Sequence, residues 1–357
     1  MTGQPIDPER LQARARQFSE MLTAAKVAAL VGVGDQLGLF QALAECPASA
    51  AEFAARTGMA ERWLLEWLRC MAAAGVAEYG RDGRFSLTPE TAVCLSGADS
   101  LFCVAGSFAS LLAQGAILDR IAGAFRTGAG PAVDVRGEAG TRGIERQFGA
   151  WHRGVLVKHA LPLLDGVVAK LSAGARAADV GCGAGVALVE MAKAFPRSEF
   201  HGYDNSEHAL ARAEENRAAA RVANLQFHNA DRDRLPADRS FDLVTTFDCL
   251  HDMTHPELAA AAIRRALADD GTWFILDIDG RATFEENLAE LPMAASLYAS
   301  SVLGCLGSGT SEAGGAGLGT LGLPQPAMRA LVASAGFTRF RRVDLRSPVN
   351  AHYEARP

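Results

Sequence analysis

From residue 176 onward, short apolar runs alternate with longer segments of helical periodicity. The runs have the length and composition of buried strands and cover residues 177–180, 199–203, 225–228, 241–247 and 271–277. The segments between them have apolar residues at helical spacing and cover residues 187–195, 206–219 and 256–268. Strands that alternate with helices predict an α/β fold with a parallel sheet wrapped by helices.

The first hundred residues have a different pattern, which predicts mostly helices. Residues 10–45 predict two or three helices with a break around residues 32–34, and Ser49 to Glu52 match a capping box that begins a short helix. A longer helix is expected at 60–74, followed by two alternating runs around Asp82-Gly83 that predict a β-hairpin. Helix, turn, helix and hairpin in this order predict a winged helix.

A winged helix can bind DNA through a recognition helix, and this requires a basic face. The helix at that position has Arg62 and Arg69 as its basic residues, against Glu61 and Glu66. We therefore prefer a module for dimerisation and for closing over a substrate. A DNA-binding regulator remains the alternative.

Between and after these regions lie segments with candidate pocket residues. Residues 101–125 predict an apolar helical stretch, 127–143 a glycine-rich turn region, and 144–171 a helical segment that carries Trp151 and His152 as candidate substrate contacts. Residues 284–302 predict an apolar helix, with Met293 and Tyr298, that forms a wall of the substrate pocket. The eight glycines of 304–322 predict a mobile loop, either a lid or a connector.

Composition narrows the classes of partner. The net charge of −6 supplies no electrostatic attraction for nucleic acid or for an anionic membrane. The N-terminus lacks the pattern of a secretory signal, and no apolar run is long enough to span a membrane. Seven scattered cysteines without a Cys-x-x-Cys pair are typical of reduced thiols. We expect a cytoplasmic protein without a metal site.

Polar residues stand at the end of each predicted strand. The first strand ends in Asp179 and a turn with glycines at 181, 183 and 185, which lets the backbone approach a ligand closely. The second ends in Asp204, at the spacing of an acid that holds a ribose diol, and the third in Asn229 to Asp231. The carboxyl ends of parallel strands are where α/β folds bind ligands.

These motifs resemble the class I S-adenosylmethionine-dependent methyltransferases. The matching stretches are Asp179-Val-Gly-Cys-Gly-Ala-Gly185, Gly202-Tyr-Asp204, Ala230-Asp231 and Phe241-Asp242-Leu-Val. With the winged helix in front, the chain further resembles the small-molecule O-methyltransferases. The resemblance implies a Rossmann-like sheet and a homodimer that uses no nucleic acid or membrane partner. The implied domains are a dimerisation domain at 1–105, a helical linker and pocket segment at 106–165, and the methyltransferase domain at 166–357.

The resemblance also assigns roles to residues. The cofactor S-adenosylmethionine would be held by Asp179, Gly181, Cys182, Gly183, Gly185, Asp204, Asn205, Asp231, Arg232, Phe247 and Asp248. Leu250-His251-Asp252 matches the motif whose histidine is the general base of O-methyltransferases, and a histidine suits proton removal near neutral pH.

Two departures and several alternatives stay open at this point. Phe247 stands where plant-type relatives often carry a lysine, and the carboxylate partner of His251 is one of Asp277, Asp279 and Glu285. His251 and Asp252 could instead shape the loop that enters the next helix, where Thr254 begins a possible capping box. The acceptor atom could be oxygen, sulfur or nitrogen, and a thiol would need less help from a base.

Overall fold

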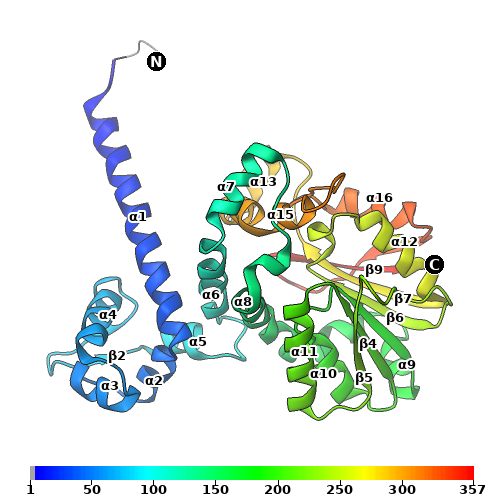
Figure 1. Ribbon diagram of the computed structural model, residues 1–357, viewed down its shortest axis with the longest axis horizontal. Helices are drawn as coiled ribbons and strands as arrows, with labels where there is room; N and C mark the ends of the chain where they lie inside the picture. The colour runs from blue at the N-terminus through cyan, green and yellow to red at the C-terminus, as the bar shows by residue number, and fades with distance from the viewer. Residues whose placement is uncertain (1–4) are drawn as a thin grey trace. The chain divides into compact units, whose positions relative to one another are not determined.

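The computed structural model of the chain describes residues 5–357. Its internal contacts divide the chain into two compact units, one that ends at Leu112 and one that covers Ala113–Pro357. Figure 1 shows the helices and strands of each unit. Within the described residues, no single helix is both long enough and apolar enough to cross a membrane.

The first unit begins with one long helix, α1 (Pro8–Gln36). The predicted break at residues 32–34 is wrong, because the helix runs through both of its glycines. A Cβ on Gly34 would lie 2.5 Å from the ring of Trp67, and one on Gly32 would lie 2.7 Å from Leu112. The glycines therefore allow close packing of side chains against α1. The helix ends only at Leu37 and Gly38, where the backbone turns left-handed at Gly38.

The rest of the first unit confirms the winged helix. Its elements are α2 (Leu39–Glu45), α3 (Ala50–Thr57), α4 (Glu61–Ala73), β1 (Glu78–Tyr79), β2 (Phe85–Ser86) and α5 (Pro89–Ser96). The capping box at Ser49 and Glu52 forms as expected, and the hairpin turns at the predicted Asp82-Gly83. Leu64, Leu68 and Met71 of α4 are buried in the core of this unit.

Helices precede the sheet in the second unit, but their bounds differ from the expected ones. They are α6 (Ala105–Gly115, which crosses the boundary between the units), α7 (Leu118–Thr127), the 3-10 helix η1 (Val133–Arg136), α8 (Gly137–Trp151), the π-helix η2 (His152–Ala160), the 3-10 helix η3 (Leu161–Leu163) and α9 (Val167–Ala173). The predicted turn region 127–143 is wrong in its second half, where α8 already begins. Gly130 instead packs against Gly307, because a Cβ there would lie 2.4 Å from the Cα of Gly307.

The seven-stranded sheet confirms the predicted α/β class. Its order is β5-β4-β3-β6-β7-β9-β8, with β3 to β7 parallel and β9 antiparallel to both of its neighbours. The strands are β3 (Arg176–Val180), β4 (Glu199–Asp204), β5 (Leu225–Asn229), β6 (Phe241–Phe247), β7 (Leu267–Ile278), β8 (Arg339–Arg342) and β9 (Asn350–Arg356). In this register Asp179 lies beside Gly202 and Thr245, so the polar strand ends meet at one edge.

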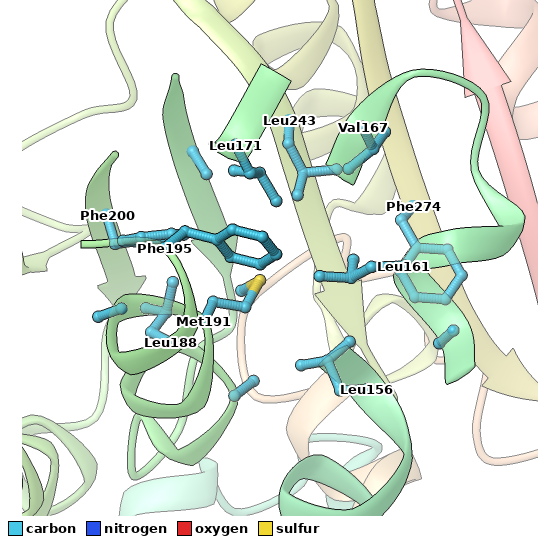
Figure 2. Close-up of a cluster of buried hydrophobic side chains, with 14 of the residues drawn as sticks. Leu156, Leu161, Val167, Leu171, Leu188, Met191, Phe195, Phe200, Leu243 and Phe274 are labelled. Atoms are coloured by element: carbon cyan, nitrogen blue, oxygen red, sulfur yellow. The ribbon is translucent and has the colours of Figure 1, made fainter. Parts of the chain in front are cut away.

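Helices bury both faces of the sheet. On one face, apolar side chains of η2, η3, α9 and α10 (Val186–Ala194) pack on the strands, as Figure 2 shows for Leu156, Leu171 and Met191. Helix α11 (Glu207–Ala220) packs against α10 and α8. On the other face, α12 (Pro256–Ala266) and α16 (Gln325–Ser334) cover the strands. Neighbouring residues such as Ala177 and Ala178 therefore belong to opposite cores.

The segment after β7 is more broken than its apolar pattern suggests. It contains α13 (Phe284–Glu290), α14 (Ala294–Ser300), the π-helix η5 (Ser301–Cys305) and α15 (Leu306–Gly309). The single helix predicted at 284–302 is wrong, because Leu291 and Pro292 interrupt it. The glycine-rich part packs closely on itself, since a Cβ on Gly315 would lie 2.4 Å from the carbonyl oxygen of Gly309.

One substitution tests how tightly the sheet packs behind the glycine turn. A Cβ on Gly202 would lie 2.5 Å from the ring of Phe227 and 2.8 Å from Leu188. We expect Gly202→Ala to lower the free energy of unfolding by about 1–3 kcal/mol, as overpacked cores do. Gly154→Ala is the control, because a Cβ there meets nothing within 4 Å and the change favours a helix. Urea denaturation of both variants measures the effect, and an unchanged Gly202→Ala would contradict it.

Candidate active site

The glycine turn connects β3 to α10 at the carboxyl edge of the sheet. Gly181, Gly183 and Gly185 all have positive φ angles, of 76°, 53° and 69°. A Cβ on Gly181 would lie 2.8 Å from Cys249, and one on Gly185 would lie 2.4 Å from Phe227. At Gly183, by contrast, the corresponding position meets no atom within 4 Å among the described residues beyond its chain neighbours. The turn is therefore packed at its two ends and open in the middle, as a ligand cradle must be.

Asp204 holds this turn in place from the end of β4. One of its carboxylate oxygens accepts a hydrogen bond from the Gly183 N–H at 2.8 Å, and the other accepts from the Ser206 N–H at 2.9 Å. Burial raises the pKa of Asp204 above its usual value, while these backbone N–H groups oppose the rise. The Ser206 hydroxyl in turn donates to Asp134. The acid predicted to contact the ribose thus lies directly against the open middle of the turn.

Asp179 lies beneath the turn and is almost completely buried. It accepts a hydrogen bond from the Thr245 hydroxyl at 2.7 Å. Burial raises the pKa of Asp179 to about 7, because the hydrogen bond from Thr245 offsets only part of the desolvation and Asp204 adds repulsion. Cys182 is also buried, and burial raises the pKa of its thiol well above the usual range. Burial therefore favours the protonated, uncharged forms of the Asp179 carboxyl and the Cys182 thiol.

The third strand end is more exposed than the first two. Asp231 lies at the surface, and its N–H donates to the Asn229 side chain at 3.0 Å. Arg232 is exposed as well and forms an ion pair of 2.8 Å with Glu207. Their predicted contacts with the adenine, and that of Asn205, stay predictions.

Aromatic side chains gather at the end of β6. The ring of Phe247 lies 5.8 Å from that of Trp151 and 5.4 Å from that of His152. Trp151 also stacks on His352 of β9, with 5.7 Å between the ring centroids. Burial lowers the pKa of His152 to about 4, so this histidine is neutral at physiological pH. The structure thus brings the predicted Trp151, His152 and Phe247 together, and adds His352, which no sequence motif had indicated.

Asp248 follows Phe247 in a strained backbone conformation. Its φ angle is +51°, which is uncommon for any residue other than glycine. One carboxylate oxygen accepts from Asn350 at 2.7 Å, whereas the other is buried without a hydrogen-bond partner among the described residues. Burial, together with repulsion from Asp277, raises the pKa of Asp248 to about 8. Strain and an unpaired buried oxygen at one residue are typical of a binding site.

His251 lies on the short 3-10 helix η4 (Leu250–Asp252) and pairs with Asp277 at the end of β7. Its Nδ1 is 2.6 Å from the Asp277 carboxylate, and the side chains are 4% and 1% exposed. Asp277 also accepts from the N–H of Ile278 at 2.8 Å. Burial alone would lower the pKa of His251, but Asp277 and Asp252 raise it well above its ordinary value. Of the three carboxylates left open by the sequence, Asp277 is therefore the partner of the histidine.

The other nitrogen of His251, Nε2, faces Asp252 and Cys305. Nε2 lies 3.4 Å from an Asp252 carboxylate oxygen, and Cys305 comes from η5, far along the chain. Sequence reasoning missed Cys305 because no motif connects a lone cysteine at this distance to residue 251. The predicted wall residues lie elsewhere on the same segment. Met293 is half exposed, and Tyr298 contacts Phe284 and Asn287, so their substrate role stays a prediction.

The buried Asp179 generates a test that does not depend on any ligand. Its pKa is raised from 3.8 to about 7 in the folded state, so the folded protein keeps a proton that the unfolded chain loses. As pH rises from about 3.8 to about 7, the free energy of unfolding of the wild type should therefore fall relative to that of Asp179→Asn. At about 1.36 kcal/mol per pKa unit, the fall is at most about 4 kcal/mol. Urea denaturation of both proteins across this window measures the difference. A difference that does not vary with pH would contradict the raised pKa.

Comparison with known protein families identifies both parts of the chain. The model of a methyltransferase domain matches residues 171–313, and that of an Rv2258c-like winged HTH domain matches residues 25–97. A search of curated proteins finds no match to this chain. The winged helix and the methyltransferase domain that the motifs indicated are thus confirmed.

Solved structures of the same fold match nearly the full chain. A putative O-methyltransferase from Nostoc punctiforme is 17% identical with a TM-score of 0.70, and 99% of each chain is covered. Human N-acetylserotonin methyltransferase in complex with S-adenosylmethionine is 19% identical with a TM-score of 0.66, over 100% of this chain and 99% of that one. The mitomycin 7-O-methyltransferase MmcR is 19% identical with a TM-score of 0.65, over 98% and 100%. The chain therefore carries a methyltransferase domain joined to an N-terminal winged helix-turn-helix domain, and it shares its fold with these solved methyltransferases.

Proposed function

We propose that this methyltransferase transfers a methyl group to a hydroxyl of a small molecule, with His251 as the general base. The observation that carries the proposal is the contact of 2.6 Å between His251 Nδ1 and Asp277. It places an oriented histidine at the carboxyl edge of the sheet, where the glycine turn also lies.

The residues around the glycine turn fit S-adenosylmethionine. The open position at Gly183 leaves room for a ligand against the backbone, and Asp204 lies beside it with carboxylate oxygens that suit hydroxyl groups. We propose that these two residues contact the cofactor together with Asp179, Gly181, Cys182, Gly185 and Asn205. Asp231 and Arg232 would contact the adenine, and Phe247 and Asp248 would lie near the sulfonium. When bound, the cofactor supplies an electrophilic methyl group.

His251 would take the proton of the acceptor hydroxyl at Nε2. Asp277 holds the other ring nitrogen, so the proton on Nδ1 stays in place and Nε2 is the nitrogen that exchanges a proton. Because Asp277 and Asp252 raise the pKa of His251, Nε2 must lose its own proton before it accepts that of the hydroxyl. After proton transfer the imidazolium lies between the carboxylates of Asp277 and Asp252, which stabilise its charge. The same carboxylates explain why this base is strong. The remaining requirement is alignment, which the buried pair supplies by fixing the ring.

Oxygen is favoured as the acceptor atom because a hydroxyl needs this base. A thiol ionises near pH 8.5 without help and gains less from it. The mitomycin enzyme among the structural neighbours is by its name a 7-O-methyltransferase. A small-molecule S- or N-methyltransferase remains the alternative, and it predicts turnover that depends little on His251.

A regulator that binds DNA through the winged helix is the second candidate function, and the charges of α4 argue against it. Both basic residues of this helix are engaged with one acid. Arg62 lies 2.6 Å and Arg69 lies 3.1 Å from the same oxygen of Glu66. This cancels much of the positive charge that phosphate contacts require.

We propose that the N-terminal unit dimerises through the first half of α1. Leu11, Phe18 and Leu22 share one face of this helix and are 57%, 63% and 58% exposed. An apolar stripe of this kind on a long helix indicates an interaction surface. A second copy of the chain, with an identical stripe, can cover it in a symmetric contact.

We also propose that the protein acts in the cytoplasm. All seven cysteines are free thiols in the structure, which suits a reducing compartment.

The base assignment predicts a large loss of turnover in His251→Ala. We expect kcat to fall by about 10²-fold or more, as for removal of a general base, while the dissociation constant of S-adenosylhomocysteine stays within about twofold. Asp277→Asn should also lower kcat, because it removes the charge that orients and stabilises the histidine. Both are measured with a panel of hydroxylated small molecules and labelled S-adenosylmethionine.

His255→Ala is the matched control, since His255 lies four residues further on at the partly exposed N-cap of α12. Its turnover should remain close to that of the wild type. If His251→Ala kept full turnover on the same acceptor, His251 would not be the base. A thiol or an amine that is methylated while every alcohol fails would favour the alternative.

The dimer proposal predicts a change in mass. Phe18→Asp with Leu22→Glu places charges in the apolar stripe, and we expect the protein to sediment as a monomer where the wild type sediments as a dimer. Leu258→Glu is the control, because Leu258 is similarly exposed, at 62%, but lies on α12. Sedimentation equilibrium measures the masses. A wild-type monomer, or a double variant that remains dimeric, would contradict the proposed surface.

A further inference from the structure

The side chains around Nε2 of His251 form a group that the mechanism does not fully use. His251, Asp252 and Cys305 each offer one ligand atom, and these three atoms lie within 4.8 Å of one another. They are a ring nitrogen, a carboxylate oxygen and a sulfur. The sequence predicted no metal site because Cys305 is far from the other two in the chain. The fold brings it there through η5.

The spacing of the nitrogen and oxygen atoms suits tetrahedral coordination. The Nε2 of His251 and the Oδ1 of Asp252 are 3.4 Å apart. Two ligands at about 2.0–2.2 Å from Zn²⁺ at a tetrahedral angle are separated by about 3.3–3.6 Å. The distance is therefore too long for a hydrogen bond with good geometry but matches two ligands of one ion.

Oδ1 of Asp252 lacks a hydrogen bond at this place. The atom is buried, and Nε2 of His251 lies 3.4 Å from it, which is an ion-pair distance and too long for a hydrogen bond with good geometry. A buried carboxylate oxygen without a hydrogen bond is costly, and buried charges are normally paired or bound to a metal. A cation between Asp252, His251 and Cys305 would give this oxygen a closer partner.

The surrounding residues already have the arrangement that supports metal ligands. Asp277 contacts Nδ1 of His251 at 2.6 Å, which is the carboxylate–histidine contact that orients a metal-binding imidazole. The Thr320 hydroxyl donates to the Cys305 sulfur at 3.0 Å and so orients the third ligand. Two of the three ligands therefore have a positioning contact of their own.

The types of ligand select the kind of ion. Thiolate and imidazole favour Zn²⁺ and other thiophilic metals, whereas Mg²⁺ and Ca²⁺ prefer oxygen ligands alone. Three protein ligands leave a fourth position open, as in zinc sites that can admit water or a small ligand.

We propose that His251, Asp252 and Cys305 form a binding site for a thiophilic divalent cation such as Zn²⁺. Binding releases the thiol proton of Cys305 and the proton on Nε2 of His251 to solvent, and the cation then occupies the lone pair of Nε2. That lone pair is the one assigned to the acceptor proton, so the cation inhibits methyl transfer. This last consequence rests on the proposed function, whereas binding itself does not.

Metal binding is tested on the full chain after treatment with a chelator. Isothermal titration with Zn²⁺ should show one site per chain, with protons released on binding. Co²⁺ in its place should give the absorption band of a cobalt–thiolate bond. Cys305→Ser should abolish this band and weaken Zn²⁺ binding at least tenfold, and Asp252→Asn should weaken it similarly. Cys46→Ser is the control, because Cys46 is an exposed free thiol elsewhere, and it should bind as the wild type does.

The outcomes separate this proposal from the proposed function. Equal Zn²⁺ affinity in wild type and Cys305→Ser, or a cobalt complex without the thiolate band, would overturn the metal site even if methyl transfer is intact. Specific binding by a protein that methylates no acceptor would support the site and contradict only the function. In an active protein, Zn²⁺ should inhibit the wild type at least tenfold more strongly than Cys305→Ser, and equal inhibition would overturn the inhibitory role.

Discussion

The burial of aspartates at the ends of the parallel strands is the constraint on which the site depends. Asp179, Asp204, Asp248 and Asp277 lie at or directly after the ends of β3, β4, β6 and β7, where Asp179 and Asp277 are buried and Asp204 and Asp248 are partly buried. A buried carboxylate must be neutralised or given hydrogen bonds. Each of the four meets this need with a different group, namely the Thr245 hydroxyl, backbone N–H groups, the Asn350 amide and the His251 ring. The same contacts orient the glycine turn and the proposed base.

This constraint links the fold to the chemistry. The glycine turn is held by Asp204, and the histidine by Asp277, so each proposed role depends on one carboxylate in the sheet. Where hydrogen bonds do not compensate burial, the pKa rises, as in Asp179 and Asp248. Burial therefore favours the protonated, neutral forms of these two carboxyls. A positively charged ligand bound nearby would favour their ionised forms and would lower both pKa values.

Much of the fold was predictable because it depends on local patterns. Apolar runs between helical segments located the parallel strands, and the Ser49 capping box and the Asp82-Gly83 turn located the winged helix. The wrong helix break in the first unit has a tertiary cause. Gly32 and Gly34 were read as helix breakers, but they are small so that Trp67 and Leu112 can pack against α1. In the sequence, a glycine that ends a helix looks the same as a glycine that lets a side chain pack against the helix. Only the tertiary contact distinguishes the two.

For the site, the sequence could supply the motif residues but not the contacts between distant ones. The choice of Asp277 over Asp279 and Glu285 depends on the register of β7 against β6, which no local pattern determines. Cys305 is the last residue of the π-helix η5, which continues directly from α14. These two elements together bring Cys305 to His251. A lone cysteine in an apolar run carries no signal of this.

We propose that the carboxyl edge of this sheet binds S-adenosylmethionine and places it beside His251. The most direct measurement is a crystal structure of the chain with S-adenosylhomocysteine. We predict that the ligand lies against Gly183, with its ribose hydroxyls on Asp204 and its sulfur on the same side as His251. A ligand bound elsewhere, or a folded protein that shows no binding of this ligand at millimolar concentration, would contradict the account.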